Sequence, residues 1–90
     1  MKLISKVQVK NKNGLHTRPA TAIVKMLQNV KSDVTFTYKG DTINAKSILS
    51  ILMLAAKMNA KITISVEGEN AEETMEQLVR AFDNQFEEQQ

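Results

Sequence analysis

The hydrophobic pattern of this 90-residue chain switches repeatedly between two periods, and this switching limits the folds that it can adopt. Alternation of apolar and polar residues predicts strands with one buried face. Apolar residues at three- and four-residue spacing predict amphipathic helices. The predicted strands are residues 3–9, 34–38, 42–44 and 61–67, and the predicted helices begin at Pro19, Ser47 and Ala71 and extend to about residues 28, 59 and 86.

The order of these elements is β-α-β-β-α-β-α. Strands that alternate keep one face on the core and one face in water, which is typical of antiparallel or mixed sheets. The helices are then expected to cover the buried face. We therefore predict an α/β fold of the α+β type, an open-faced sandwich, with residues 1–90 forming a single domain around one core.

Several helix ends carry recognisable capping residues. Ser47 suits an N-cap, because its hydroxyl can accept a hydrogen bond from a free backbone N–H. Asn59 suits the left-handed position after a helix. Asn70 and Glu73 have the spacing of a capping box, and Phe86 is expected on the buried face of the last helix. The acidic tail at residues 87–90 opposes the helix dipole and is expected to fray.

Composition excludes several classes of protein. The chain has no cysteine and a single histidine, so we expect neither a disulfide framework nor a metal site, and no cofactor. The net charge of +2 comes from scattered lysines and predicts no nucleic-acid partner. The N-terminus has no signal-peptide pattern, and the longest apolar run, residues 48–56, is about half of the ~20 residues that a membrane span needs. We therefore expect a cytoplasmic protein without membrane insertion.

The scarce residue types gather in the segment NKNGLHTRPAT, residues 11–21. It holds His16, the only histidine, Pro19, the only proline, and Gly14, one of three glycines. Glycine allows a close backbone turn, and proline suits the first turn of a helix. His16 is therefore expected in a loop just before a helix N-terminus, where free N–H groups attract anions. Arg18 adds a donor group that is matched to phosphate.

This arrangement suits an imidazole that accepts a phosphoryl group. A lone histidine is most often a surface or structural residue, but neutral imidazole is also a competent nucleophile. A helix N-terminus and an arginine would stabilise the resulting phosphohistidine. The sequence near His16 shows no further acid, base or metal-binding cluster. We therefore interpret the chain as a carrier of the group, and not as an enzyme that completes a reaction alone.

The predicted helix at residues 47–59 has more apolar surface than a helix on a sheet can bury. One stripe has helical spacing, and a second stripe lies displaced around the axis. Either the helix is covered on all sides, or one stripe docks a partner. Periodicity alone leaves open which stripe is exposed. The two stripes are Ile51, Leu54, Ala55 and Met58, and Ile48, Leu49, Leu52 and Met53.

Two segments make the chain recognisable. GLHTRPAT, residues 14–21, resembles the active-site signature of HPr, the histidine-containing phosphocarrier family of the phosphoenolpyruvate-dependent phosphotransferase system. AKSILSILML, residues 45–54, resembles the regulatory-serine segment of that family. The length and the order of elements match as well, so the resemblance covers essentially the whole chain. Thr17, where alanine is frequent, and Asn59, where glycine is usual, are departures that leave the fold unaffected.

The resemblance implies a specific chemistry and fold. His16 would take a phosphoryl group on Nδ1 from phosphorylated enzyme I and give it to enzyme IIA domains, with Arg18 stabilising the phosphate. The sheet would be four-stranded and antiparallel, in the order 1-4-2-3, with three helices on one face. Ile51, Leu54, Ala55 and Met58 would then belong to the core. The partner-docking surface would comprise Thr17, Ala20, Thr21, Ile48, Leu49, Leu52 and Met53.

The resemblance also makes Ser47 a candidate for regulatory phosphorylation by an HPr kinase, beside its simpler role as an N-cap. Three functions stay open. The first is a phosphocarrier for sugar uptake. The second is the same carrier chemistry in a regulatory, nitrogen-type phosphorelay, which the aliphatic run at residues 48–54 favours. The third is an interaction module regulated through Ser47, with His16 a bystander. We expect a monomer in each case.

Overall fold

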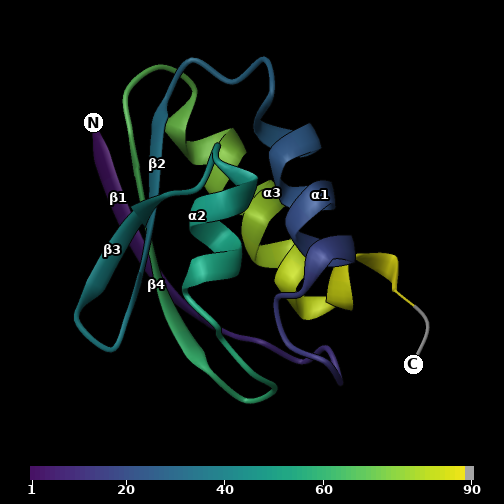
Figure 1. Ribbon diagram of the computed structural model, residues 1–90. Helices are drawn as coiled ribbons and strands as arrows, with labels where there is room; N and C mark the ends of the chain where they lie inside the picture. Colours follow the sequence, from purple (N-terminus) through teal and green to yellow (C-terminus); the bar gives the residue numbers. More distant parts are fainter. Residues whose placement is uncertain (89–90) are drawn as a thin grey trace.

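The computed structural model describes residues 1–88 of the chain. Strands and helices follow in the predicted order (Figure 1). The strands are β1 (Lys2–Gln8), β2 (Asp33–Tyr38), β3 (Asp41–Asn44) and β4 (Lys61–Glu67), and the helices are α1 (Thr17–Leu27), α2 (Ile48–Met53) and α3 (Ala71–Asp83), followed by a short 3-10 turn, η1 (Gln85–Glu87).

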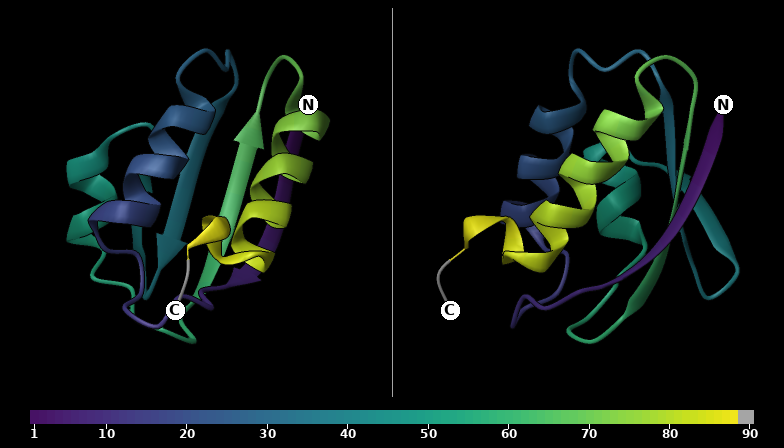
Figure 2. Two further views of the ribbon diagram at one scale, coloured as in Figure 1. Left: turned by 90° about the vertical axis from the view of Figure 1, so that its right-hand side faces the viewer. Right: turned by 180° about the vertical axis from the view of Figure 1, so that it is seen from behind.

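The four strands form one antiparallel sheet in the order β1-β4-β2-β3. In β4, Val66 pairs with Leu3 of β1 on one side and with Val34 of β2 on the other, so the apolar positions of neighbouring strands stay in register. The three helices lie on one face of the sheet, and the other face is open (Figure 2). The predicted open-faced sandwich and its strand order are confirmed.

The core lies between the sheet and the helices, and the alternating residues supply it. Phe36 of β2 meets Phe82 of α3 edge to face, with ring centroids 5.6 Å apart. Such pairs stabilise a fold beyond the area that they bury. The predicted stripe of α1 is confirmed, since Ala20, Ile23 and Leu27 are buried. The largest fully buried apolar side chains are Phe36, Phe82, Ile23, Leu27, Ile51, Ile62, Ile64, Leu78, Val9, Val34 and Val66.

The prediction for the second helix was wrong in its length. α2 ends at Met53, and Ala55 has a φ of +52°, a left-handed conformation that stops the helix. Ile51 and Leu54 are buried as expected, but Ala55 and Met58 are exposed, because the helical period ends before them. Asn59 is left-handed as predicted, with a φ of +76°. It lies in the following turn, where its N–H donates to the Val9 carbonyl, and not at the helix end.

Both ends of α3 differ from the prediction. Asn70 is left-handed, with a φ of +61°, and its side chain makes no capping hydrogen bond. An N-cap residue needs extended backbone to reach the next turn, so no capping box forms. The helix ends at Asp83, and Phe86 follows in η1. Phe86 nevertheless packs on the core, because its ring meets that of Phe82 at a centroid distance of 4.9 Å.

Within residues 1–88, no helix combines the length and the apolar character that a membrane span requires.

Candidate functional site

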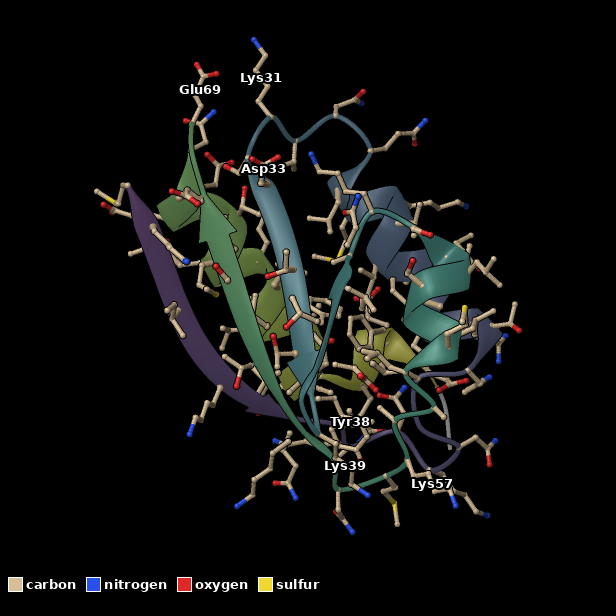
Figure 3. All side chains as sticks on the ribbon, turned by 60° about the vertical axis from the view of Figure 1, so that its left-hand side comes forward. Lys31, Asp33, Tyr38, Lys39, Lys57 and Glu69 are labelled. Atoms are coloured by element: carbon tan, nitrogen blue, oxygen red, sulfur yellow. The ribbon has the colours of Figure 1, made fainter. Side chains whose placement is uncertain are left out.

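The loop before α1 is held in one conformation by backbone contacts. Gly14 has a φ of +71°, and a Cβ there would overlap the carbonyl oxygen of Ala56. The Leu15 N–H donates to that same carbonyl at 2.9 Å, and the Leu15 side chain is buried. Only glycine permits this close approach. The loop therefore lies at the Lys57 end of the molecule, opposite the end that carries Lys31 and Glu69 (Figure 3).

His16 is the N-cap residue of α1. Its backbone is extended, with φ −83° and ψ −166°, and its carbonyl accepts the first helical hydrogen bond, from the Ala20 N–H at 3.0 Å. Its side chain makes no capping hydrogen bond, so the N-cap residue itself provides no acceptor for the first N–H groups of the helix. A helix N-terminus in this state favours an anion. The imidazole thus stands at the point where a phosphate would be stabilised.

The imidazole contacts a carboxylate that sequence analysis missed. His16 Nε2 lies 2.7 Å from Oε2 of Glu88, and the two side chains are 34% and 8% exposed. The contact is close enough for an ion pair, but it is not aligned as a hydrogen bond. The prediction of a frayed tail is therefore wrong at Glu88, and so is the absence of an acid near His16. Residues 89 and 90 of that predicted tail lie outside the described residues.

The tail reaches His16 because the chain turns back after α3. Gln85, Phe86 and Glu87 all have positive φ, between 54° and 60°. Asn11, which is fully buried, donates from Nδ2 to the Gln85 carbonyl at 3.0 Å and to Glu88 Oε1 at 2.7 Å. Figure 2 shows the C-terminal segment beside the start of α1. Nothing in the local pattern marks this turn, because helical spacing alone assigns Phe86 to α3.

Arg18 lies exposed in the first turn of α1, and within residues 1–88 its guanidinium has neither a hydrogen bond nor an ion pair. Together with Pro19 and Ala22 it lines an open pocket of about 320 Å³, whose other side is formed by Phe86, Glu87 and Glu88. A guanidinium without a partner retains its donors for a phosphate. In the described part of the chain, no three side chains of the metal-binding types gather.

The predicted docking residues divide into exposed and buried ones. On α2, Ile48, Leu49 and Met53 are 38%, 67% and 73% exposed, whereas Leu52 is half-buried against the core. The exposed stripe is thus the one that the resemblance selected. On α1, Ala20 is fully buried, so its assignment to the docking surface was wrong, because it faces the sheet.

The two threonines of α1 complete that surface only in part. Thr17 is exposed, and Thr21 is half-buried, with its hydroxyl donating to the Thr17 carbonyl at 2.8 Å. We therefore define the docking surface as Thr17, Thr21, Ile48, Leu49 and Met53, with Leu52 at its buried edge.

Ser47 is the N-cap of α2, as predicted. Its hydroxyl accepts from the Ser50 N–H at 3.2 Å, and its carbonyl accepts from the Ile51 N–H at 3.1 Å. The hydroxyl therefore serves as acceptor for one of the free N–H groups at the start of α2. Because Ile48 and Leu49 follow at once, any group added to this oxygen would stand beside the docking surface.

Comparison with known proteins shows the family of the chain. Residues 4–84 match the model of the PTS HPr component phosphorylation site. The phosphocarrier protein HPr of Chlamydia muridarum is 42% identical over 78 residues, which cover 87% of this chain and 75% of that protein.

Solved structures agree with this match. HPr-C-His of Thermoanaerobacter tengcongensis has a TM-score of 0.92 at 31% identity, covering 98% of this chain and 99% of that one. The phosphocarrier protein HPr of Bacillus anthracis has a TM-score of 0.83 at 40% identity, covering 88% and 94%. The sequence motifs, the sheet order and these matches agree, and the chain belongs to the HPr family of phosphocarrier proteins of the phosphotransferase system.

Proposed function

We propose that this chain carries a phosphoryl group on His16, which it takes from phosphorylated enzyme I and gives to enzyme IIA domains. The observation that supports this most directly is the position of the imidazole at the N-terminus of α1, which His16 does not cap, with Arg18 two residues further on and unpaired within residues 1–88. In this role the chain is a substrate of enzyme I, and not an enzyme itself. It acts in the cytoplasm as a monomer, with residues 1–90 forming one domain.

The reacting atom in this proposal is Nδ1 of His16. Nε2 is buried against Glu88, which leaves Nδ1 as the nitrogen available to a donor. The N–H groups of the first helical turn and the Arg18 guanidinium would stabilise the phosphate by charge-assisted hydrogen bonds, about 1.5–3 kcal/mol each. Those contacts stabilise the phosphohistidine moderately, so the group can still be passed on.

The docking surface would bring both partners to His16. Leu49 and Met53 expose large apolar side chains on α2, and the segment after α2 contacts the loop before α1, where the Leu15 N–H donates to the Ala56 carbonyl. Apolar groups at the centre of an interface commonly supply most of its affinity. Enzyme I and the IIA domains would therefore use the same surface in turn.

Sugar uptake is the process that we propose this carrier to serve. The exposed aliphatic face of α2 also suits a regulatory branch of the system, in which the last acceptor controls physiology and no sugar moves. The chemistry of His16 is the same in both branches. The identity of the IIA domain that accepts the group separates them.

The experiment is intact-protein mass measurement after incubation with phosphoenolpyruvate and enzyme I. The wild type is expected to gain one acid-labile phosphate, and His16→Ala is expected to gain none. Adding candidate IIA domains should then discharge the phosphoprotein. A folded wild type that gains no phosphate with enzyme I from several sources would instead favour an interaction module with Ser47 as its switch.

A further inference from the structure

Glu88 covers the ring nitrogen of His16 that the proposed reaction leaves unused. Its Oε2 lies 2.7 Å from Nε2, and Nε2 is buried although the whole side chain is 34% exposed. The exposed part of the ring therefore excludes Nε2. A phosphoryl donor that approaches from solvent meets a ring with only Nδ1 left to attack.

The carboxylate is held in place by other groups. Its second oxygen, Oε1, accepts from Asn11 Nδ2 at 2.7 Å, and Asn11 is fully buried. The same Asn11 nitrogen donates to the Gln85 carbonyl at 3.0 Å, and the Phe86 ring packs on Phe82. The Glu88 side chain is only 8% exposed. The two carboxylate oxygens thus have separate partners, one on the scaffold and one on the imidazole.

The attack itself creates the charge that this carboxylate would stabilise. The Nδ1 lone pair forms the new N–P bond, and the bond between phosphorus and the donor breaks, its electron pair leaving with the donor. The proton on Nε2 stays where it is, so the ring becomes a phosphoimidazolium with one positive charge. Groups that are already oriented toward a developing charge lower the barrier most effectively. A carboxylate beside an imidazole acts in this way in the catalytic triads of hydrolases.

We infer that Glu88 is a positioning residue, which keeps the proton on Nε2, directs phosphorylation to Nδ1 and stabilises the phosphoimidazolium. The inference rests on the proposed function of His16. Arg18 lines the same pocket as Glu88 and supplies the opposite charge, so the incoming phosphate does not meet the carboxylate alone. In the return step, the protonated ring leaves as neutral imidazole, a better leaving group than its anion.

Phosphoramidate tests this inference without any partner protein, because it donates its phosphoryl group to imidazole and releases ammonia. Glu88→Gln removes the charge but keeps the shape, and we expect phosphate uptake about tenfold slower than in wild type. Glu88→Ala also uncovers Nε2, so a second isomer phosphorylated on Nε2 is expected by ³¹P and ¹⁵N NMR. Glu76→Gln is the control for the loss of a carboxylate, since Glu76 is exposed in the middle of α3 and lies outside the pocket of Arg18 and Glu88. It should behave as wild type.

Uptake by Glu88→Gln at the wild-type rate or faster would overturn the inference, and so would a single Nδ1 isomer in Glu88→Ala. The same proteins are then offered phosphorylated enzyme I. A wild type that reacts with phosphoramidate but not with phosphorylated enzyme I would refute the proposed function and leave the role of Glu88 intact. A wild type that reacts with both donors, and no faster than Glu88→Gln, would support the proposed function and refute the role of Glu88.

Discussion

The N-termini of α1 and α2 treat their free N–H groups differently. Both N-cap residues have extended backbone, with φ −83° at His16 and φ −112° at Ser47. Ser47 caps α2 with its own hydroxyl, whereas the side chain of His16 caps nothing. The α2 terminus is therefore satisfied at rest, and the α1 terminus keeps its donors for something that arrives later.

This difference indicates which of the two helix N-termini has backbone N–H groups available to bind a ligand. A cap adds about 1 kcal/mol to the stability of a helix. At α1 that stabilisation is absent, because the N-cap position is occupied by the imidazole of His16, which makes no capping hydrogen bond. At α2 it is used, so a phosphate on Ser47 would have to replace an existing hydrogen bond. If the proposed function holds, the first site serves phosphoryl transfer and the second serves the structure of the helix.

The strongest way to break the comparison is to make the two termini alike. His16→Ser would give α1 the cap that α2 has, and it should raise the free energy of unfolding by about 0.5–1 kcal/mol. Phosphate uptake from enzyme I should be lost completely. Urea unfolding and intact mass measure the two effects. His16→Ala is the control, since it should lose uptake with no gain in stability. A destabilised His16→Ser would show that the N-terminus of α1 does not lack a capping group.

The next variant removes the free guanidinium donors in the first turn of α1 and leaves its backbone N–H groups in place. Arg18→Ala should slow phosphoryl transfer from enzyme I by about 10- to 100-fold, because one or two charge-assisted hydrogen bonds to the phosphate are lost. The free energy of unfolding should change by less than about 0.5 kcal/mol, since Arg18 is exposed and unpaired within residues 1–88. Single-turnover kinetics and urea unfolding separate the two. A large loss of stability would mean that Arg18 is structural.

The sequence pattern predicted correctly those features that depend on neighbouring residues alone, such as strand register and helix starts. β4 was predicted at residues 61–67 and is observed at Lys61–Glu67, because strict alternation against a buried face specifies the register of a strand. His16 and Ser47 were predicted at helix starts from another local signal, since proline and serine mark the first turn of a helix within a few residues.

Tertiary contacts decided the features that pattern missed. α2 stops at Met53 because Ala55 turns left-handed, and the next residue, Ala56, presents its carbonyl to the loop before α1. Glu88 reaches His16 because buried Asn11, more than seventy positions away in the chain, holds the tail. No window of a few residues contains either contact. The family resemblance supplied the sheet order and the exposed stripe, but not the carboxylate.

A third variant tests the surface that lies between the two termini. Leu49→Ser should raise the KM for enzyme I by about 10- to 100-fold, because burying a leucine at an interface contributes about 1.5–3 kcal/mol. Its stability should hardly change, since Leu49 is 67% exposed. Ile51→Ala, two residues on, is the matched contrast. Ile51 is fully buried, and its loss should destabilise the fold by about 2–4 kcal/mol. If Leu49→Ser leaves KM unchanged, the docking surface lies elsewhere.

The smallest effects distinguish the two roles of Ser47. Ser47→Ala removes the cap and should lower the free energy of unfolding by about 1 kcal/mol, while uptake of phosphate from enzyme I stays as in wild type. Ser47→Asp keeps a capping oxygen, so stability should be retained. It also adds a negative charge beside Ile48 and Leu49, which should slow uptake by about threefold, in line with the ~0.5–1 kcal/mol that one exposed charge contributes. Ser47→Ala thus changes the stability of the fold, whereas Ser47→Asp changes the rate of phosphate uptake. A Ser47→Asp protein that accepts phosphate as fast as wild type would show that Ser47 acts only as an N-cap and not as a regulatory site. The two helix N-termini would then differ only in that His16 takes part in phosphoryl transfer and Ser47 stabilises its helix.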